Sequence, residues 1–299
     1  MLAESISIGA SDNVDLIKVR LVNELKQFES RGLKFNFKES PVGKYTFLSC
    51  SVVGQGQCAF SEEDSMALFK HYIADVLSDM ILGKWQKTLL AEIIQENYYY
   101  FGEDDRRAIF QNALNYLDCD SKDSGAVLWS RKKRKILSKL KEFLGACNQI
   151  VIDGFIRFRL KEYIRELQEA ADKAADDFLM DREYKEFIQL LKYFVDIQDC
   201  RIDVVNVVMK SGGVFKLFDG QNRVINSAYL EGFIFDLIES DINYEDLLIS
   251  ALITIAPREI VFHTGGAAGP SGTLDTIRNI FCQRVTVCNG CELCKSGEN

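Results

Sequence analysis

The sequence predicts a helix-dominated α+β protein in which a helical middle is flanked by two small α/β segments. Only 3 prolines and 20 glycines interrupt 299 residues, which favours long helices over an architecture with many turns. Apolar residues recur at helical spacing through the middle of the chain, whereas short β-branched and aromatic runs occupy its two ends. We therefore expect a β-α-β-β unit over residues 1–60, a helical region over 61–200 and a small α/β region over 201–299.

The first region begins with a short strand, Ser5–Ile8, followed by a helix that buries one apolar face. Two strands follow, with alternating apolar residues from Leu33 and a second strand over Tyr45–Val53. The segment Ser40–Gly43 contains proline and glycine and is expected to turn one strand into the next.

The helical middle should start at Ser61, which with Asp64 resembles a capping box. Further helices are expected near residues 85–98, 104–117 and 131–144, with Ser130 as the cap of the last. The stretch Gly154–Cys200 then shows apolar residues at steps of three and four. Within it, Asp181 either caps a new helix or lies inside one long bent helix.

Beyond residue 200 the apolar period changes from helical to alternating, as in a small sheet with helices packed on it. The two ends of the chain could contribute to one shared sheet. Strands are expected at 204–208, 214–218, 259–263 and 284–287. Helices are expected at 229–238, 244–255 and 274–281.

Composition narrows the class of protein. The formal net charge of −8 and the pI near 5.1 argue against a surface that is basic throughout. The N-terminus lacks the pattern of a secretory signal, and the longest apolar run, Leu247–Ala256, is about half the roughly 20 residues of a membrane-spanning helix. We therefore expect a cytoplasmic protein without membrane insertion. With two histidines and no recognisable catalytic set, the sequence leans away from an enzyme.

Nine cysteines in a large chain without an export signal indicate reduced thiols or metal ligands. Five are scattered and are expected to be small buried apolar residues: Cys50, Cys58, Cys119, Cys147 and Cys200.

The other four cysteines form the pattern Cys282-x5-Cys288-x2-Cys291-x2-Cys294. This spacing allows four thiolates to converge on one zinc ion, and His263 is an alternative to Cys282 as the fourth ligand. An iron–sulfur cluster is the alternative cofactor, although the ferredoxin-type run is incomplete. The competing interpretation is a tail with free thiols, or a Cys282 that is buried in the core.

Two further segments have a functional and a structural interpretation. Thr264–Thr273 is rich in glycine and lies between a strand and a helix, where it either cradles a phosphate or simply connects them. A basic run on a predicted helix is either a solvated face or a contact for nucleic acid. That run begins with Arg131, Lys132, Lys133, Arg134 and Lys135 and continues to Lys141.

Three segments identify a family: GFIRFRLKEY (154–163), DREYKEFIQLLKYFV (181–195) and TIRNIFCQRVTVCNGCELC (276–294). In these the chain resembles the YtxC-like family of endospore-forming bacteria, whose members are classed as sporulation proteins. The resemblance covers roughly residues 60–294. It implies a cytoplasmic bacterial protein linked to sporulation, and it supplies no catalytic residue.

The leading hypothesis is therefore a non-enzymatic binding or structural protein that acts in sporulation, with a protein partner and a C-terminal structural metal. One alternative is an enzyme or redox sensor that uses the same thiols or an iron–sulfur cluster. The other alternative is a protein that binds nucleic acid through the basic helix.

Overall fold

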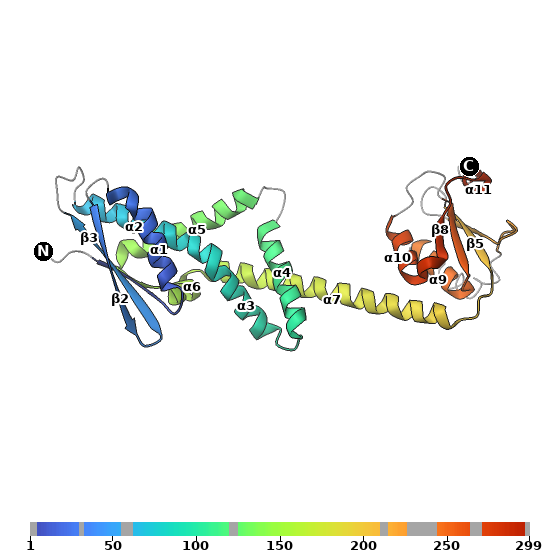
Figure 1. Cartoon of the computed structure of the whole chain (residues 1–299), viewed down its shortest axis with the longest axis horizontal. Coiled ribbons are helices and arrows are strands. Elements are labelled where there is room, and N and C mark those ends of the chain that lie inside the picture. Colours follow the sequence, from blue (N-terminus) through green and yellow to red (C-terminus); the bar gives the residue numbers. More distant parts are fainter. Residues whose placement is uncertain are drawn as a thin grey trace. The chain divides into compact units, whose positions relative to one another are not determined.

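The computed structural model describes residues 5–29, 33–54, 62–119, 125–209, 215–225, 244–263 and 271–296. The predicted helix-dominated α+β class is confirmed (Figure 1). The elements follow in the order β1 Ser5–Ala10, α1 Val14–Glu29, β2 Leu33–Val42, β3 Tyr45–Gly54, α2 Glu62–Met80, the π-helical turn η1 Ile81–Trp85, α3 Gln86–Asn97, α4 Glu103–Cys119, α5 Gly125–Ala146, β4 Gln149–Val151, α6 Ile152–Arg159, α7 Lys161–Ile197, β5 Val204–Met209, β6 Phe215–Phe218, α9 Tyr244–Ile255, β7 Glu259–His263, α10 Ser271–Phe281, the 3₁₀ turn η3 Cys282–Arg284, β8 Val285–Val287 and α11 Glu292–Ser296.

The chain divides into two compact units, Met1–Leu179 and Met180–Asn299, and the division falls inside α7. The described strands form two separate four-stranded sheets, β2-β3-β1-β4 in the first unit and β6-β5-β7-β8 in the second. The suggestion that the two ends of the chain share one sheet is therefore wrong. Each sheet has its own apolar core, so each unit buries the apolar face of its own strands.

In the first unit, β1 is central and pairs antiparallel with β3 and parallel with β4. Its residues Ile6 and Ile8 are fully buried, as is Ile17 on α1. The hairpin between β2 and β3 turns at Gly43, whose φ of 62° suits glycine. Pro41 lies in β2, which is an edge strand and can tolerate a missing N–H donor.

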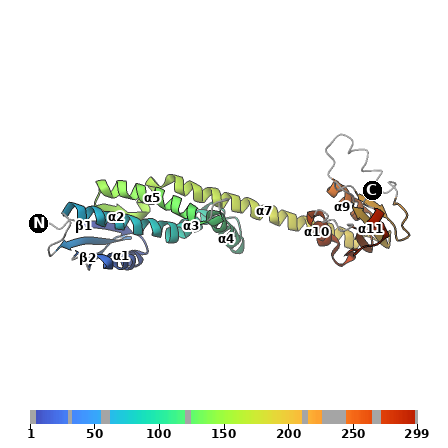
Figure 2. The ribbon, with the colours of Figure 1, turned by 90° about the horizontal axis from the view of Figure 1, so that it is seen from above.

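In the first unit, α2 and α5 pack against each other. A single π-helical turn joins α2 to α3 and buries Trp85. The helix α5 begins at Gly125, so the predicted cap Ser130 lies inside it and that prediction is wrong. Figure 2 shows α5 beside the first turns of α7, where the Lys135 Nζ and Glu166 Oε1 atoms are 4.0 Å apart.

The helical break in the stretch 154–200 lies at Leu160 and not at Asp181. Leu160 ends α6 with φ −108° and ψ 38°, and α7 then runs through Asp181 to Ile197. Of the two alternatives for Asp181, the long helix is therefore the one observed. The N-terminal part of α7 buries Leu167 and Ala174 in the first unit, and its C-terminal part contributes Val195 to the core of the second.

The second unit contains three parallel strands, because β5 and β8 both pair parallel with β7. The strand β6 pairs antiparallel with β5. Val205 and Val207 of β5 are fully buried and belong to the same apolar core as residues of α9 such as Leu252. Because β5, β7 and β8 run in one direction, their carboxyl ends meet at one edge of the sheet.

Several predictions fall outside the described residues. These are the helix start at Ser61, the helix at 229–238, and residues 264–270 of the glycine-rich loop.

Candidate metal centre

The edge of the second sheet brings His263 and Cys288 together. His263 is the last residue of β7, and Cys288 comes directly after β8. The Cys288 backbone N–H donates to the carbonyl of Phe262 at 2.8 Å, which extends the parallel pairing by one residue. A histidine and a cysteine 25 residues apart in the chain are thus adjacent because two parallel strands end side by side.

The remaining thiols come from the short segment after β8. Gly290 has φ 127°, a conformation that a residue with a Cβ rarely adopts, and it turns the chain between Cys288 and Cys291. The short helix α11 then follows and carries Cys294, which is buried. Figure 1 shows α11 at the end of β8. The turn therefore brings Cys291 and Cys294 back towards the edge of the sheet where Cys288 lies.

Four potential ligand atoms converge at this edge, from His263, Cys288, Cys291 and Cys294, and all lie within 4.8 Å of one another. The His263 Nδ1 atom is 3.2 Å from Cys291 Sγ and 3.5 Å from Cys294 Sγ. The two sulfurs of Cys291 and Cys294 are 3.8 Å apart. With a zinc–sulfur bond of about 2.3 Å, sulfurs at two corners of a tetrahedron are roughly 3.7 Å apart. The cluster has the dimensions of a site for one ion.

Cys282 lies outside this cluster. It starts the 3₁₀ turn that precedes β8, it is exposed, and its thiol lies 3.7 Å from the carbonyl of Asn279. The cluster forms at the opposite end of β8, and each strand residue advances the chain by about 3.3 Å. The structure therefore brings together three of the four predicted cysteines and places His263, the alternative ligand, in the fourth position.

His263 is buried, with 4% of its surface exposed. Desolvation by burial lowers the pKa of His263, which favours the neutral ring. Its second ring nitrogen, Nε2, lies 3.0 Å from Asn206 Oδ1 on β5. A neutral imidazole is the form that binds a metal ion.

The backbone around the thiols acts on their ionisation. Hydrogen bonding from the Cys294 N–H lowers the pKa of Cys291 and thereby favours its thiolate. The Gly290 N–H also donates to Cys288 Sγ, at 3.4 Å. This bond lowers the pKa of Cys288, but burial and the neighbouring thiols of Cys291 and Cys294 together outweigh it, so that pKa is raised. The lowered pKa makes the Cys291 proton easier to lose, and an ion would have to displace the thiol protons of the cluster.

Asn206 was not identified from the sequence. The signal was present, because an asparagine interrupts the run VVNVVM of a strand with buried valines. A polar side chain on such a strand needs a hydrogen-bonding partner.

The scattered cysteines are only partly as predicted. Cys50 is fully buried, whereas Cys147 and Cys200 are exposed, so the prediction of burial is wrong for those two. Cys147 and Cys200 lie beyond the ends of α5 and α7, where the chain leaves the helix at the surface. The side chains of Cys58 and Cys119 lie outside the described residues.

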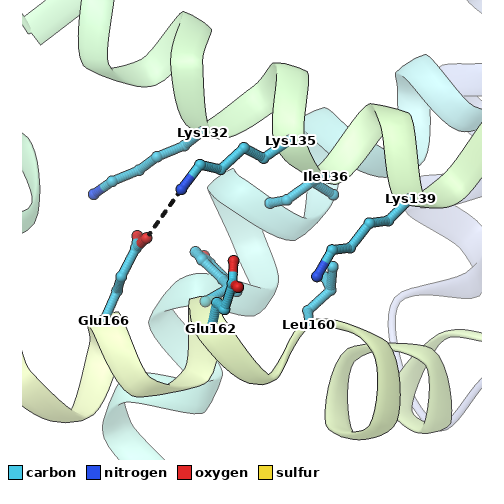
Figure 3. A pocket seen from close by; sticks show the side chains of 8 residues that line it. Lys132, Lys135, Ile136, Lys139, Leu160, Glu162 and Glu166 are labelled. Atoms are coloured by element: carbon cyan, nitrogen blue, oxygen red, sulfur yellow. Dashed lines mark ion pairs between the residues drawn. The ribbon is translucent and has the colours of Figure 1, made fainter.

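The basic run on α5 is largely engaged within the first unit. Lys133 Nζ lies 2.9 Å from Asp75 Oδ1 and 2.7 Å from Asp79 Oδ1 on α2. Lys132 donates to the carbonyl of Leu117 at 3.3 Å, and Lys135 faces Glu166 on α7 (Figure 3). The cavity between α5 and α7 is small, at about 30 Å³. Contact with nucleic acid through this helix stays an alternative interpretation.

Comparison with known proteins then decides the family. The sequence profile of the YtxC-like family matches residues 71–286. The chain belongs to the YtxC-like family. It is 28% identical over 224 residues to the protein named "Uncharacterized protein YtxC" of Bacillus subtilis (strain 168), covering 72% of this chain and 76% of that one. No solved structure matches the chain.

The region that matches the YtxC-like family covers most of both units. It contains His263 and Asn206 and ends at Thr286, two residues before Cys288. The three clustered thiols therefore follow directly after the matched region. No described helix combines the length and the apolar character needed to cross a membrane.

Proposed function

We propose that this YtxC-like protein is a cytoplasmic, non-enzymatic binding protein of sporulation in which one zinc ion holds the C-terminal segment against the second sheet. His263, Cys288, Cys291 and Cys294 would be the ligands. The single observation that supports this is the convergence of their four ligand atoms within 4.8 Å. The bound ion would tie the end of β7 to the segment after β8, and a structural zinc site contributes directly to folding free energy.

The donor set favours zinc over an iron–sulfur cluster. Three cysteines and one histidine are a common set for structural zinc, and four protein ligands leave no open position. An iron–sulfur cluster contains several metal atoms, so its ligands lie farther apart than ligands that share one ion. Sulfurs 3.8 Å apart therefore fit a single ion better.

Metal analysis of the purified full-length chain tests this proposal. We expect about one zinc per chain and no visible absorption. A brown protein with iron and sulfide would instead support the iron–sulfur alternative. A chain that remains without stoichiometric metal after incubation with zinc under reducing conditions would overturn the proposal.

A redox or thiol-dependent activity is the second candidate. The lowered pKa of Cys291, caused first by the N–H of Cys294, favours a reactive thiolate, and the Cys291 side chain is partly exposed. Reversible disulfide formation among the three thiols, measured by mass spectrometry after mild oxidation of the protein as purified, would support this candidate. Retention of bound zinc without disulfide formation would argue against it.

A protein partner is supported by exposed apolar side chains on α7. Met180, Phe187 and Ile197 are each more than half exposed.

The role in sporulation is supported by membership of the YtxC-like family. Deleting the gene in its own host and counting heat-resistant spores tests this role. We expect fewer spores, with recovery by the wild-type gene and not by a Cys291→Ser variant. A normal spore yield in the deletion strain would overturn the sporulation role.

A further inference from the structure

The orientation of the Asn206 side chain is determined by its two neighbours. Its amide nitrogen Nδ2 donates to the backbone carbonyl of Asp219 at 3.0 Å, and its Oδ1 lies 3.0 Å from His263 Nε2. A carbonyl oxygen only accepts hydrogen bonds, so the NH₂ group must face Asp219. The amide oxygen must therefore face the imidazole ring.

The carbonyl of Asp219 belongs to a turn after β6 that several hydrogen bonds hold in place. The Asp219 carboxylate accepts hydrogen bonds from the backbone N–H groups of Gln221 and Arg223, both at 2.9 Å. It also accepts one from the Arg223 side chain at 2.8 Å. The Asp219 N–H donates to the Arg223 carbonyl at 2.9 Å. A rotation of the Asn206 amide would break its bond to a carbonyl that cannot follow.

This arrangement determines which ring nitrogen of His263 carries the proton. An amide oxygen can only accept, so Nε2 must be the N–H donor. In a neutral ring, Nδ1 then keeps its lone pair, and Nδ1 is the atom that lies 3.2 Å from Cys291 Sγ. The lone pair faces the thiol cluster.

We propose that Asn206 is a positioning residue that holds His263 in the Nε2–H tautomer and so makes Nδ1 the fourth ligand of a divalent metal ion such as zinc. This inference rests on the proposed zinc site. A ligating histidine usually donates its other N–H to a fixed acceptor, and loss of that acceptor typically weakens metal binding about 10–100-fold.

Two substitutions separate this role from a general effect on the fold. Asn206→Leu removes the acceptor, so an Nε2–H would be buried without a partner and the proton should move to Nδ1. Asn206→Asp loses the hydrogen bond to the Asp219 carbonyl but keeps an oxygen beside Nε2, so it tests the acceptor itself and serves as the conservative rescue. Asn279→Leu, at an exposed position of α10 in the same unit, is the matched control.

The tautomer can be read directly, because the chain has only two histidines. With ¹⁵N-labelled histidine and a His71→Gln background, the full-length metal-free protein gives the NMR signals of one ring. We expect the Nε2–H pattern in the wild type, in Asn206→Asp and in Asn279→Leu, and a shift towards Nδ1–H in Asn206→Leu. Titration with Co²⁺, with Zn²⁺ as competitor, should show about 10–100-fold weaker binding by Asn206→Leu alone.

The outcomes distinguish the two proposals. A wild-type chain that takes up neither Co²⁺ nor Zn²⁺ overturns the zinc site and this inference with it. A wild-type chain that binds metal, with Asn206→Leu unchanged in affinity and tautomer, overturns the role of Asn206 and leaves the zinc site standing. An Nδ1–H pattern in the metal-free wild type also overturns the role of Asn206. Because the NMR signal comes from the ring itself, partial destabilisation of Asn206→Leu does not imitate the expected result.

Discussion

His263 Nδ1 and Cys291 Sγ lie 3.2 Å apart although the two residues are 28 positions apart in the chain. This contact joins the end of a central sheet strand to the segment that follows the last strand. The sheet alone already places β7 beside β8, so a metal ion would only need to secure the segment from Cys288 to Cys294. The stabilisation by metal should therefore be concentrated at the C-terminal end of the second unit.

The first prediction compares two cysteine-to-serine variants. Cys291→Ser should lose metal and destabilise the C-terminal segment, because a serine hydroxyl is a poor zinc ligand. Cys282→Ser should keep about one metal per chain, because Cys282 lies outside the cluster. Metal content together with limited proteolysis checks both variants. Equal metal loss in the two would show that Cys282 belongs to the site.

The second prediction concerns thiol reactivity in the native protein. Burial raises the pKa of Cys50 to about 12, so its thiol should stay protonated and protected from iodoacetamide near pH 8. Exposed Cys147, Cys200 and Cys282 should be labelled quickly. Mass spectrometry of tryptic peptides reads each site.

Labelling of the clustered thiols provides the internal comparison. Cys288 and Cys291 should be protected in the zinc-loaded protein and become labelled after addition of a chelator, because thiolates bound to zinc are less available to the reagent. Labelling that is the same with and without chelator would contradict a metal at these residues.

The third prediction is a pH dependence of stability in metal-free protein. Burial lowers the pKa of His263, so below its ordinary pKa of about 6.5 the unfolded chain binds more protons than the folded one. The free energy of unfolding should therefore fall as the pH drops from about 6.5 through the folded-state pKa.

Urea unfolding in the presence of a chelator measures this effect. The wild type should lose more stability between about pH 7 and pH 5 than His263→Gln, which lacks the titrating ring. His71→Gln, at an exposed position, should behave like the wild type. Equal pH slopes for wild type and His263→Gln would exclude a contribution from this residue.

The fourth prediction concerns the packing of α2 against α5. Lys133 lies between Asp75 and Asp79 and is 19% exposed, so its removal leaves two neighbouring carboxylates without their cation. Lys133→Met should lower the free energy of unfolding by about 1–3 kcal/mol, the usual effect of removing a partner from charged hydrogen bonds. Arg131→Met, on the exposed side of the same helix, should change it by less than about 0.5 kcal/mol. Equal effects in chemical denaturation would contradict the bridging role of Lys133.

The fifth prediction addresses nucleic acid. Lys133 and Lys135 face carboxylates, and the net charge of the chain is −8. We therefore expect no binding of a fluorescent duplex near physiological salt, about 0.15 M, in anisotropy titrations. Binding that weakens steeply with added salt and is lost in an Arg131→Glu, Arg134→Glu variant would instead favour the nucleic-acid alternative.

The sequence by itself determined the class of fold and most of its elements. Local periodicity placed the helix Tyr244–Ile255 and the strand Glu259–His263 at their observed bounds, because hydrophobic spacing depends only on neighbouring residues. It also singled out Cys288, Cys291 and Cys294, whose spacing is short enough to bring them together within one turn of chain.

Only the tertiary structure decided the rest. The choice of His263 over Cys282 depends on which strands are parallel neighbours, and that pairing joins residues far apart in the chain. The separation of the two sheets and the orientation of Asn206 by Asp219 arise in the same way. Such relationships leave little local pattern, because each is decided by which surfaces bury one another when the chain folds.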